Sequence, residues 1–308
     1  MRKIEKNIVK LTANLRTRFI IVEAIRKIVQ FTFLIMFSST ILGLSAIALT
    51  LPILLSSSLP SRAFEGALNV MQKMIYDAIF PFIPLASIII FGVLTGRALC
   101  GWACPLGLIQ DLLALGEKRG ITISPRTHKS LIDLKYMILA LTITLSISLS
   151  LAQFTAGGQI YRMMLGAFGQ APFTSLSPSD TLLSVLPRLF LYIQYLGFDV
   201  SIISPLLVAR LIILLAVLIL AVYIPRAWCR YLCPQGALSA MVSRFSLLGL
   251  SRSPVRCIKV GCHICEDVCP MMIPILKLPR EKFTDPECIY CLRCVTACPA
   301  RAIKLKFP

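Results

Sequence analysis

The sequence predicts a mainly α-helical membrane protein with a small, cysteine-rich C-terminal domain, and three observations lead to this prediction. Hydrophobic residues make up 57% of the 308 residues, and the mean hydropathy is +0.81, well above the values of soluble domains. The apolar residues gather in runs long enough to cross a bilayer. All twelve cysteines lie at or after Cys100, so their spacing decides whether they form disulfides, metal sites or clusters.

Four apolar stretches approach the roughly 20 residues that a spanning helix needs. They are residues 28–55, 78–95, 136–152 and 205–224. With the N-terminus inside, the three inner segments hold 27 of the 32 lysines and arginines. This bias predicts a multi-pass protein of the cell's inner (cytoplasmic) membrane, with the N-terminus and the C-terminal domain in the cytoplasm. Membrane lipid is therefore the expected partner of the basic chain, and its net charge of +18 requires no nucleic acid.

The chain divides into three parts. Residues 1–27 form a basic cytoplasmic segment, residues 28–245 a four-helix membrane domain, and residues 246–308 the C-terminal domain. The basic segment is either an amphipathic helix on the inner leaflet or a flank that only sets topology. The long, mostly uncharged outer loop at 153–204 is expected to form an interfacial or re-entrant element.

An internal repeat organises the membrane domain. The run CGWACP from Cys100 recurs at an offset of 129 residues as the run CRYLCP from Cys229. Each copy follows an inward-going helix, so we expect the four membrane helices to form two duplicated hairpins. Both pairs of cysteines then reach the same face of the membrane.

The repeat predicts one shared site built from four cysteines: Cys100, Cys104, Cys229 and Cys233. Residues four apart lie on one side of a helical turn. Arg97, Arg226 and Arg230 are expected to favour the thiolate form. The site could hold a further iron–sulfur cluster, a copper or zinc ion, or two dithiol pairs without metal. The structural alternative is that these are apolar cysteines at helix ends.

Two further cysteine runs follow: Cys257-x4-Cys262-x2-Cys265-x3-Cys269-Pro270 and Cys288-x2-Cys291-x2-Cys294-x3-Cys298-Pro299. The second has the ligand spacing of bacterial two-cluster ferredoxins. The first keeps the last two intervals and the proline but widens the first interval from two residues to four. The pattern predicts an α+β, two-cluster ferredoxin-like domain, with the type of the first cluster left open by the wider interval.

In such folds the fourth cysteine of each run binds the other cluster. We therefore expect one 4Fe-4S cluster on Cys257, Cys262, Cys265 and Cys298. The other is expected on Cys269, Cys288, Cys291 and Cys294. Zinc knuckles, which use two close pairs, are disfavoured by the interlocking runs, and disulfides are disfavoured by a reducing cytoplasm.

Histidine is scarce, since His128 and His263 are the only two. Neither lies in a predicted membrane helix, which excludes a bis-histidine haem in the bilayer. His263 is expected to pack or to form hydrogen bonds rather than to bind metal. Arg210, in the last predicted helix, would meet a quinone oxygen or a charged partner, or extend its charge to the interface.

The duplicated Cys-x3-Cys-Pro motif, the four predicted helices and the two ferredoxin runs together resemble membrane-bound polyferredoxins of the NapH type. The resemblance extends from Ile28 to the C-terminus and includes the membrane part of NosR and the CcoG proteins. It implies a quinol dehydrogenase subunit that transfers electrons between the quinone pool and a partner oxidoreductase or ferredoxin-like subunit. The CcoG relatives imply the alternative of an assembly factor that reduces copper. The wide interval between Cys257 and Cys262 departs from the usual run of the family.

Overall fold

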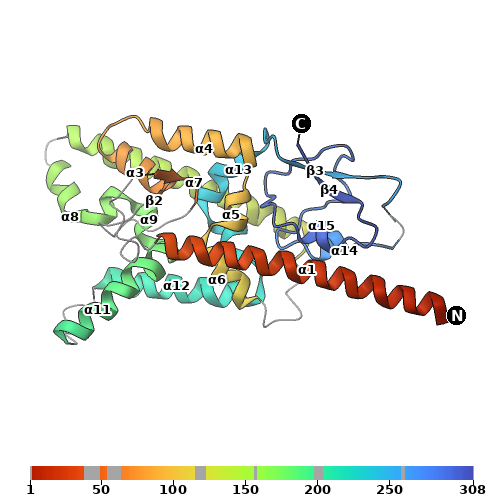
Figure 1. The fold of residues 1–308 in the computed structure, drawn as a ribbon. Helices are drawn as coiled ribbons and strands as arrows, with labels where there is room; N and C mark the ends of the chain where they lie inside the picture. Colours follow the sequence, from red (N-terminus) through yellow and green to blue (C-terminus); the bar gives the residue numbers. More distant parts are fainter. Residues whose placement is uncertain are drawn as a thin grey trace.

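The computed structural model describes residues 2–37, 49–53, 64–114, 123–155, 158–197, 204–257 and 261–307. Within them the chain is mainly helical, and the C-terminal domain lies at one end of a long bundle (Figure 1). The long helices of the bundle are α1 (Arg2–Phe37), α4 (Phe82–Thr95), α7 (Pro125–Leu151) and α12 (Pro205–Tyr223). Shorter helices join them: α3 (Ala67–Tyr76), α5 (Ala98–Trp102), α6 (Pro105–Leu113), α8 (Gly158–Gln170), α9 (Pro172–Leu176), α10 (Pro178–Asp180), α11 (Leu186–Leu196) and α13 (Pro234–Ser243).

Two of the described helices, α7 and α12, are long and apolar enough to cross a membrane. Each begins with a serine cap followed by a proline, which is a favoured helix start. The hydroxyl of Ser124 accepts the amide of Thr127, and the hydroxyl of Ser204 accepts the amide of Leu207. These helices include the predicted spans 136–152 and 205–224 apart from one terminal residue of each.

The other two predicted spans differ from the structure. The stretch 78–95 becomes the 14-residue helix α4, about 21 Å long. It begins only at Phe82 because Ala78, with φ of 56°, breaks the chain away from α3. The stretch 28–55 is not one helix, since α1 ends at Phe37 and strand β1 (Leu49–Leu51) pairs in parallel with β2 (Phe64–Gly66).

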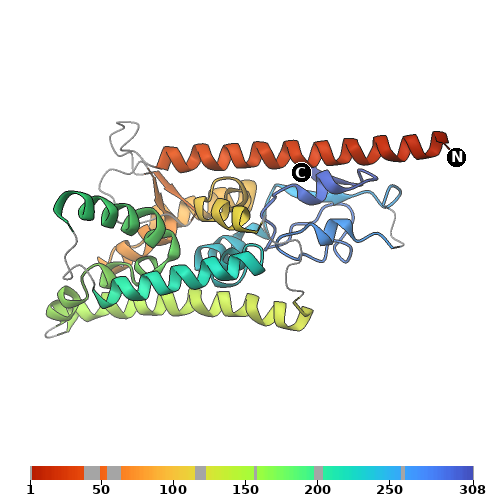
Figure 2. The same cartoon turned by 90° about the horizontal axis from the view of Figure 1, so that it is seen from below.

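Helix α1 is continuous across the boundary expected at residue 27. No glycine or proline interrupts its 36 residues, so nothing in the sequence ends the helix there. It runs beside both the bundle and the C-terminal domain (Figure 2), where it contacts α6 and α15 (Arg293–Ala297). This part of α1 therefore packs on protein.

The predicted outer loop at 153–204 is largely helical among its described residues. It contains a 3₁₀ turn (Ala152–Phe154), α8 to α11 and a π-helical turn (Thr181–Val185). Its central part is polar but buried, at Thr174, Ser175, Ser177, Ser179, Asp180, Thr181 and Ser184. Helix α10 contacts α6 and α12, so this segment folds back into the bundle.

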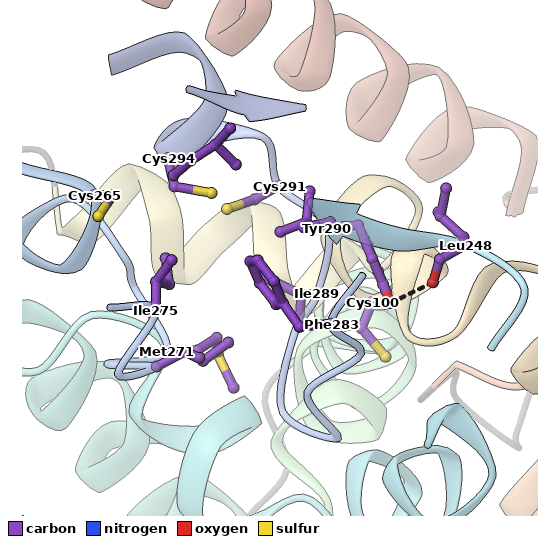
Figure 3. Packing of buried hydrophobic residues seen from close by; sticks show 13 residues of the cluster. Cys100, Leu248, Cys265, Met271, Ile275, Phe283, Ile289, Tyr290, Cys291 and Cys294 are labelled. Carbon is purple, nitrogen blue, oxygen red and sulfur yellow. Dashed lines mark hydrogen bonds between the residues drawn. The ribbon is translucent and has the colours of Figure 1, made fainter. Parts of the chain in front are cut away.

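In the C-terminal domain, a strand near the beginning pairs with a strand near the end. Strand β3 (Gly249–Arg252) pairs antiparallel with β4 (Ile303–Lys306), and α14 (Ile264–Asp267) and α15 lie between them in the sequence. Apolar side chains from both halves form one core, in which the hydroxyl of Tyr290 donates to the carbonyl of Leu248 at 2.7 Å (Figure 3). The domain is therefore a small α+β unit.

The two sequence repeats interlock through an exchange of buried arginines. Arg97 of the first repeat donates from Nη2 to the carbonyl of Cys229 at 3.3 Å. Arg226, its equivalent in the second repeat, donates from Nη1 to the carbonyl of Cys100 at 3.1 Å. Both arginines are at most 1% exposed. The arginine of each repeat therefore donates a hydrogen bond to the cysteine turn of the other repeat.

A glycine lies against each arginine. A Cβ atom at Gly236 would lie 2.8 Å from Nη2 of Arg97, and one at Gly107 would lie 3.4 Å from Nη2 of Arg226. Gly107 and Gly236 are themselves equivalent positions of the repeat. A side chain at Gly236 would therefore crowd the crossing arginine, whereas at Gly107 the nearest atom is the carbonyl oxygen of Cys100, at 3.3 Å.

The counter-charges of the two arginines come from different places. Asp111 of α6 binds Arg226 in a bidentate pair, with distances of 3.0 and 2.6 Å. The equivalent of Asp111 in the second repeat is Ala240, which has no charge. Glu287 of the C-terminal domain binds Arg97 instead, at 2.6 Å. The charge missing from the second repeat is therefore supplied by the C-terminal domain.

Helix α1 adds charges to the same network. Arg26 lies 3.0 Å from Asp111, and Glu23 binds Arg293 of the C-terminal domain at 2.7 Å. Gln30 donates to the carbonyl of Gly101 at 2.8 Å. Helix α1 therefore joins the first repeat to the C-terminal domain.

Asp111→Asn should destabilise the protein by about 3–5 kcal/mol, because it leaves Arg226 buried without its counter-charge and removes one of the two carboxylates beside Arg26. Burial raises the pKa of Asp111, but Arg226 and then Arg26 outweigh it and hold that pKa well below its ordinary value of 3.8. The stabilisation by ionised Asp111 is therefore full above pH 3.8 and is lost only as the pH falls further.

Thermal unfolding of the full chain in detergent, followed by tryptophan fluorescence between pH 5 and 8, measures the loss of stability. Asp133→Asn, at an exposed position on α7, is the matched control and should change stability by less than about 0.5 kcal/mol. Equal unfolding temperatures for the two variants would contradict the central role of Asp111.

Candidate functional site

Two cavities in the C-terminal domain are each lined by four cysteines. The inner cavity is lined by Cys269, Cys288, Cys291 and Cys294. The outer cavity is lined by Cys257, Cys262, Cys265 and Cys298. Each set therefore takes three cysteines from one run and the fourth from the other run. The structure brings together the same two sets of four that the spacing of the runs predicts.

The donors around these cavities suit an iron–sulfur cluster. All eight are free cysteines, and the other lining residues of the inner cavity are mainly apolar, including Ile273, Phe283 and Ile289. Thiolates are the ligands that such clusters take, and an apolar wall limits access of water. Within the described ranges, no three cysteine, histidine or acidic side chains gather closely enough for a single metal ion.

The paired cysteines of the repeat lie at helix starts. In each copy the second cysteine, Cys104 or Cys233, precedes a proline at the first position of α6 or α13. The amide of Gly236 donates to Sγ of Cys233 at 3.3 Å. A helix start presents unpaired amides and a positive dipole end, so it stabilises negative charge on sulfur. The Cys-Pro pair is therefore a way of placing a sulfur atom at a helix N-terminus.

The four repeat cysteines are buried at the end of the bundle that faces the C-terminal domain. Cys104, Cys229 and Cys233 share one apolar core with Trp228. Cys100 instead packs in the adjoining core, which contains Ile289, Tyr290 and Cys291 of the C-terminal domain (Figure 3). Three of the four predicted ligands therefore share one core, and Cys100 lies at the boundary between the two domains, near enough to raise the pKa of each of the other three thiols.

Burial decides the protonation of these thiols. It raises the pKa of Cys104 well above its ordinary value, and the nearby sulfur groups of Cys229, Cys100 and Cys233 raise it further. Burial also raises the pKa of Cys229 despite the opposing charge of Arg226. The neighbouring arginines favour the thiolate form, as expected, since Arg226 and Arg97 lower the pKa of Cys229, but burial outweighs them. Protons must leave when a metal or cluster binds.

The C-terminal domain contacts the repeat cysteines through the loop of the inner cavity. Trp102 donates to the carbonyl of Tyr290 at 2.9 Å. A Cβ atom at Gly101 would lie 2.3 Å from the carbonyl oxygen of Ile289, so only glycine permits this approach. From the second repeat, Arg230 donates to the carbonyl of Pro270 at 2.8 Å. Both repeats therefore bind the segments that carry the inner cysteines.

The remaining residues singled out by the sequence lie elsewhere. His128 contacts the hydroxyl of Tyr231 through Nδ1 at 2.8 Å. His263 has an exposed side chain, and its Nδ1 lies 3.8 Å from Glu266. Arg210 lines an open cavity between α11 and α12 together with Arg188 and Tyr192. None of these three residues lines either cysteine cavity.

The charged residues that hold the site together could not be found from motif spacing. Glu287, one residue before Cys288, accepts hydrogen bonds from Arg97 and from Lys135 of α7, both at 2.6 Å. Burial raises the pKa of Glu287, but Arg97 and Lys135 outweigh it and lower the pKa below its ordinary value. The one available signal is a charged residue, Lys135, directly before an apolar run. The position of Lys135 in the sequence does not indicate which residue it pairs with.

Comparison with known proteins agrees with the cysteine patterns. A family model described as a 4Fe-4S binding domain matches residues 77–122 and again 206–252, the two copies of the repeat. A second family model, also described as a 4Fe-4S binding domain, matches residues 284–304. No solved structure matched the chain.

Several known proteins are similar in sequence to this chain over most of its length. The uncharacterized protein MJ0750 of Methanocaldococcus jannaschii is 30% identical over 229 residues, which are 72% of this chain and 77% of that protein. YccM of Escherichia coli, whose name describes an electron transport protein, is 31% identical over 70% of this chain and 52% of its own length. The ferredoxin-type protein NapH of Haemophilus influenzae is 27% identical over 85% of this chain and 76% of its own length. The chain therefore belongs to the family of NapH-type polyferredoxins, and it is an iron–sulfur electron-transport protein.

Proposed function

We propose that this chain is a multi-pass inner-membrane subunit that passes electrons between the quinone pool and a partner oxidoreductase. The observation that carries the proposal is the contact of Cys100 with the loop of the inner cavity. Cys100 and Cys291 belong to one buried core, with Ile289 and Tyr290 as further members. The protein thus provides a continuous packed path from the end of the bundle to the C-terminal domain.

Three cysteine sites would take part in this electron transfer. We assign one 4Fe-4S cluster to the inner cavity, with ligands Cys269, Cys288, Cys291 and Cys294. A second belongs to the outer cavity, with ligands Cys257, Cys262, Cys265 and Cys298. A third belongs to the repeat, with ligands Cys100, Cys104, Cys229 and Cys233, where the family model of 4Fe-4S binding matches twice. Such clusters accept and donate single electrons.

Four crossings would hold the protein in the membrane. Helices α7 and α12 supply two of them. We assign the others to α4 and to the part of the chain that begins with the C-terminal end of α1. Large apolar side chains are exposed along α4 and α12, including Phe82 at 71% and Ile212 at 61%, which fits contact with lipid. The positive-inside bias places the N-terminus and residues 246–308 in the cytoplasm.

The residues of this chain orient the sulfur atoms and adjust their charge. Gln110 donates to Sγ of Cys229 at 3.3 Å, and the amide of Ala302 donates to Sγ of Cys298 at 3.3 Å. Hydrogen bonds to ligand sulfur and nearby positive charge both raise reduction potentials. Arg97 and Arg226 lie beside the repeat cysteines, so the repeat site receives both effects.

Iron analysis tests the assignment of three clusters. The full chain, purified without oxygen, should contain about 12 iron atoms and about as many acid-labile sulfides. The double variant Cys104→Ser/Cys233→Ser should lose about four of each, because it removes half of the ligands of the repeat site. An unchanged iron content in the variant would show that the repeat cysteines hold no cluster. Stoichiometric zinc or copper in the native protein would instead favour a single-ion site.

The same double variant tests the path of electrons. It should abolish quinol-dependent reduction of the two C-terminal clusters, followed by electron paramagnetic resonance, while dithionite still reduces them. Ala103→Ser, at a buried position between the first pair of cysteines, is the control and should keep quinol-dependent reduction within about threefold of the native rate. Normal reduction in the double variant would refute the relay.

Glu287→Gln tests the coupling between the domains. The amide keeps the shape of the side chain but removes the charge shared by Arg97 and Lys135, so the C-terminal domain should dock less tightly. We expect hydrogen exchange at residues 286–291 to rise at least tenfold and quinol-dependent reduction to slow, with iron content preserved. Asp133→Asn again serves as the control. Unchanged exchange in Glu287→Gln would mean that apolar contacts alone hold the domain.

A further inference from the structure

An open groove crosses the surface of the C-terminal domain beside β3 and β4. These strands lie on the side of the domain away from α1 (Figure 1). The groove holds about 1080 Å³ of open space, and the charged residues lining it are Arg252, Arg256, Arg280, Glu281, Lys304 and Lys306. Five of the six are basic. The groove is therefore a strongly basic surface on the domain that contains the two cysteine cavities.

The groove is separated from the outer cavity by a thin wall. Arg252 and Ala302 line both the groove and the outer cavity. The amide of Ser253 donates to the carbonyl of Ala302 at 2.8 Å, so the wall is the paired backbone at the ends of β3 and β4. Because electron tunnelling falls steeply with distance, a redox group held in the groove would exchange electrons with the outer site in preference to the inner one.

The basic residues of the groove are not needed for membrane topology. The charge bias that sets orientation is counted within about 15–20 residues of a spanning helix. Arg252 lies 29 residues after the end of α12 at Tyr223, and the others lie further along the chain. Among the described residues, none of the five forms an ion pair within 4 Å. Arg252 is buried and donates to the carbonyl of Ile275 at 3.2 Å. The other four are exposed, so their charge is available to a partner.

The rim of the groove offers apolar contacts as well as charge. Val255 is 93% exposed and lies between the groove residues Pro254 and Arg256. Phe307, next to Lys306, is 65% exposed. Exposed apolar side chains beside arginine and lysine are typical of a protein interface, in which charge guides the encounter and apolar anchors hold it.

We propose that this groove docks an acidic electron-carrier protein, which exchanges electrons with the outer site. The inference rests on the proposed function and adds the kind of partner and its place of binding. The carrier would present carboxylates to Arg256, Arg280, Lys304 and Lys306, with its redox group facing the wall at Arg252 and Ala302. Electrons would then enter or leave the protein at the end of its cluster series opposite to the membrane.

The test uses the full chain in nanodiscs of zwitterionic phosphatidylcholine, with flavodoxin as the acidic probe. The groove variant is Lys304→Glu/Lys306→Glu, at two exposed positions. The matched control, Lys129→Glu/Lys277→Glu, makes the same change of net charge at exposed residues that do not line the groove. Two quantities are measured: binding of oxidised flavodoxin by flavin fluorescence anisotropy, and the second-order rate of cluster reduction by flavodoxin hydroquinone.

At low ionic strength, the groove variant should lose at least tenfold in both binding and rate, and the control should change by less than about twofold. Salt should weaken the native interaction more than that of the groove variant. Reduction by dithionite must stay normal in all three proteins, which separates failure of docking from failure of the clusters and of the proposed function.

Equal losses in the groove variant and the control would show that only net charge matters and would overturn the proposal. Flavodoxin binding by the native protein that disappears in nanodiscs with anionic phosphatidylglycerol would show that lipid headgroups cover the groove, which would also overturn it.

Discussion

The structure depends on the exchange of two buried arginines between the repeats. A guanidinium shielded from water is tolerated only where acceptors and a counter-charge surround it. Arg97 and Arg226 meet this condition by binding the cysteine turn of the opposite repeat. Neither repeat can therefore complete its own turn, and the four cysteines come together only when both repeats are packed.

The duplication is symmetric in its sulfur atoms but asymmetric in its charges. The first repeat contains its own carboxylate, Asp111, whereas the equivalent position of the second repeat is Ala240. Glu287 fills this gap from the C-terminal domain and also neutralises Lys135 of α7. Docking of the domain is thus coupled to the charge balance of the bundle. This asymmetry gives the domain a defined place to bind.

Fixed spacing between the three groups of cysteines follows from these contacts. The repeat cysteines, the inner cavity and the outer cavity follow one another away from the bundle, and each junction is packed or hydrogen-bonded. Helix α1 reinforces the junction from one side through Glu23 and Arg293. The opposite side carries the basic groove and remains open. The outer cavity therefore shares a wall with the groove, on the side of the domain that α1 does not cover.

The sequence by itself determined the features that depend on local spacing. Cysteine intervals specified the two interlocked sets of four, apolar runs located α7 and α12, and the repeat offset related Cys100 to Cys229. A run of apolar residues does not reveal where a helix ends, which explains why the stretch 28–55 was not one helix.

Only the tertiary structure decided which charges meet, because the partners are 115 residues apart for Asp111 and Arg226 and 190 apart for Arg97 and Glu287. It also decided how deeply the thiols are buried. Desolvation and ion pairing depend on which distant segments share a buried volume, and sequence spacing carries no information about that.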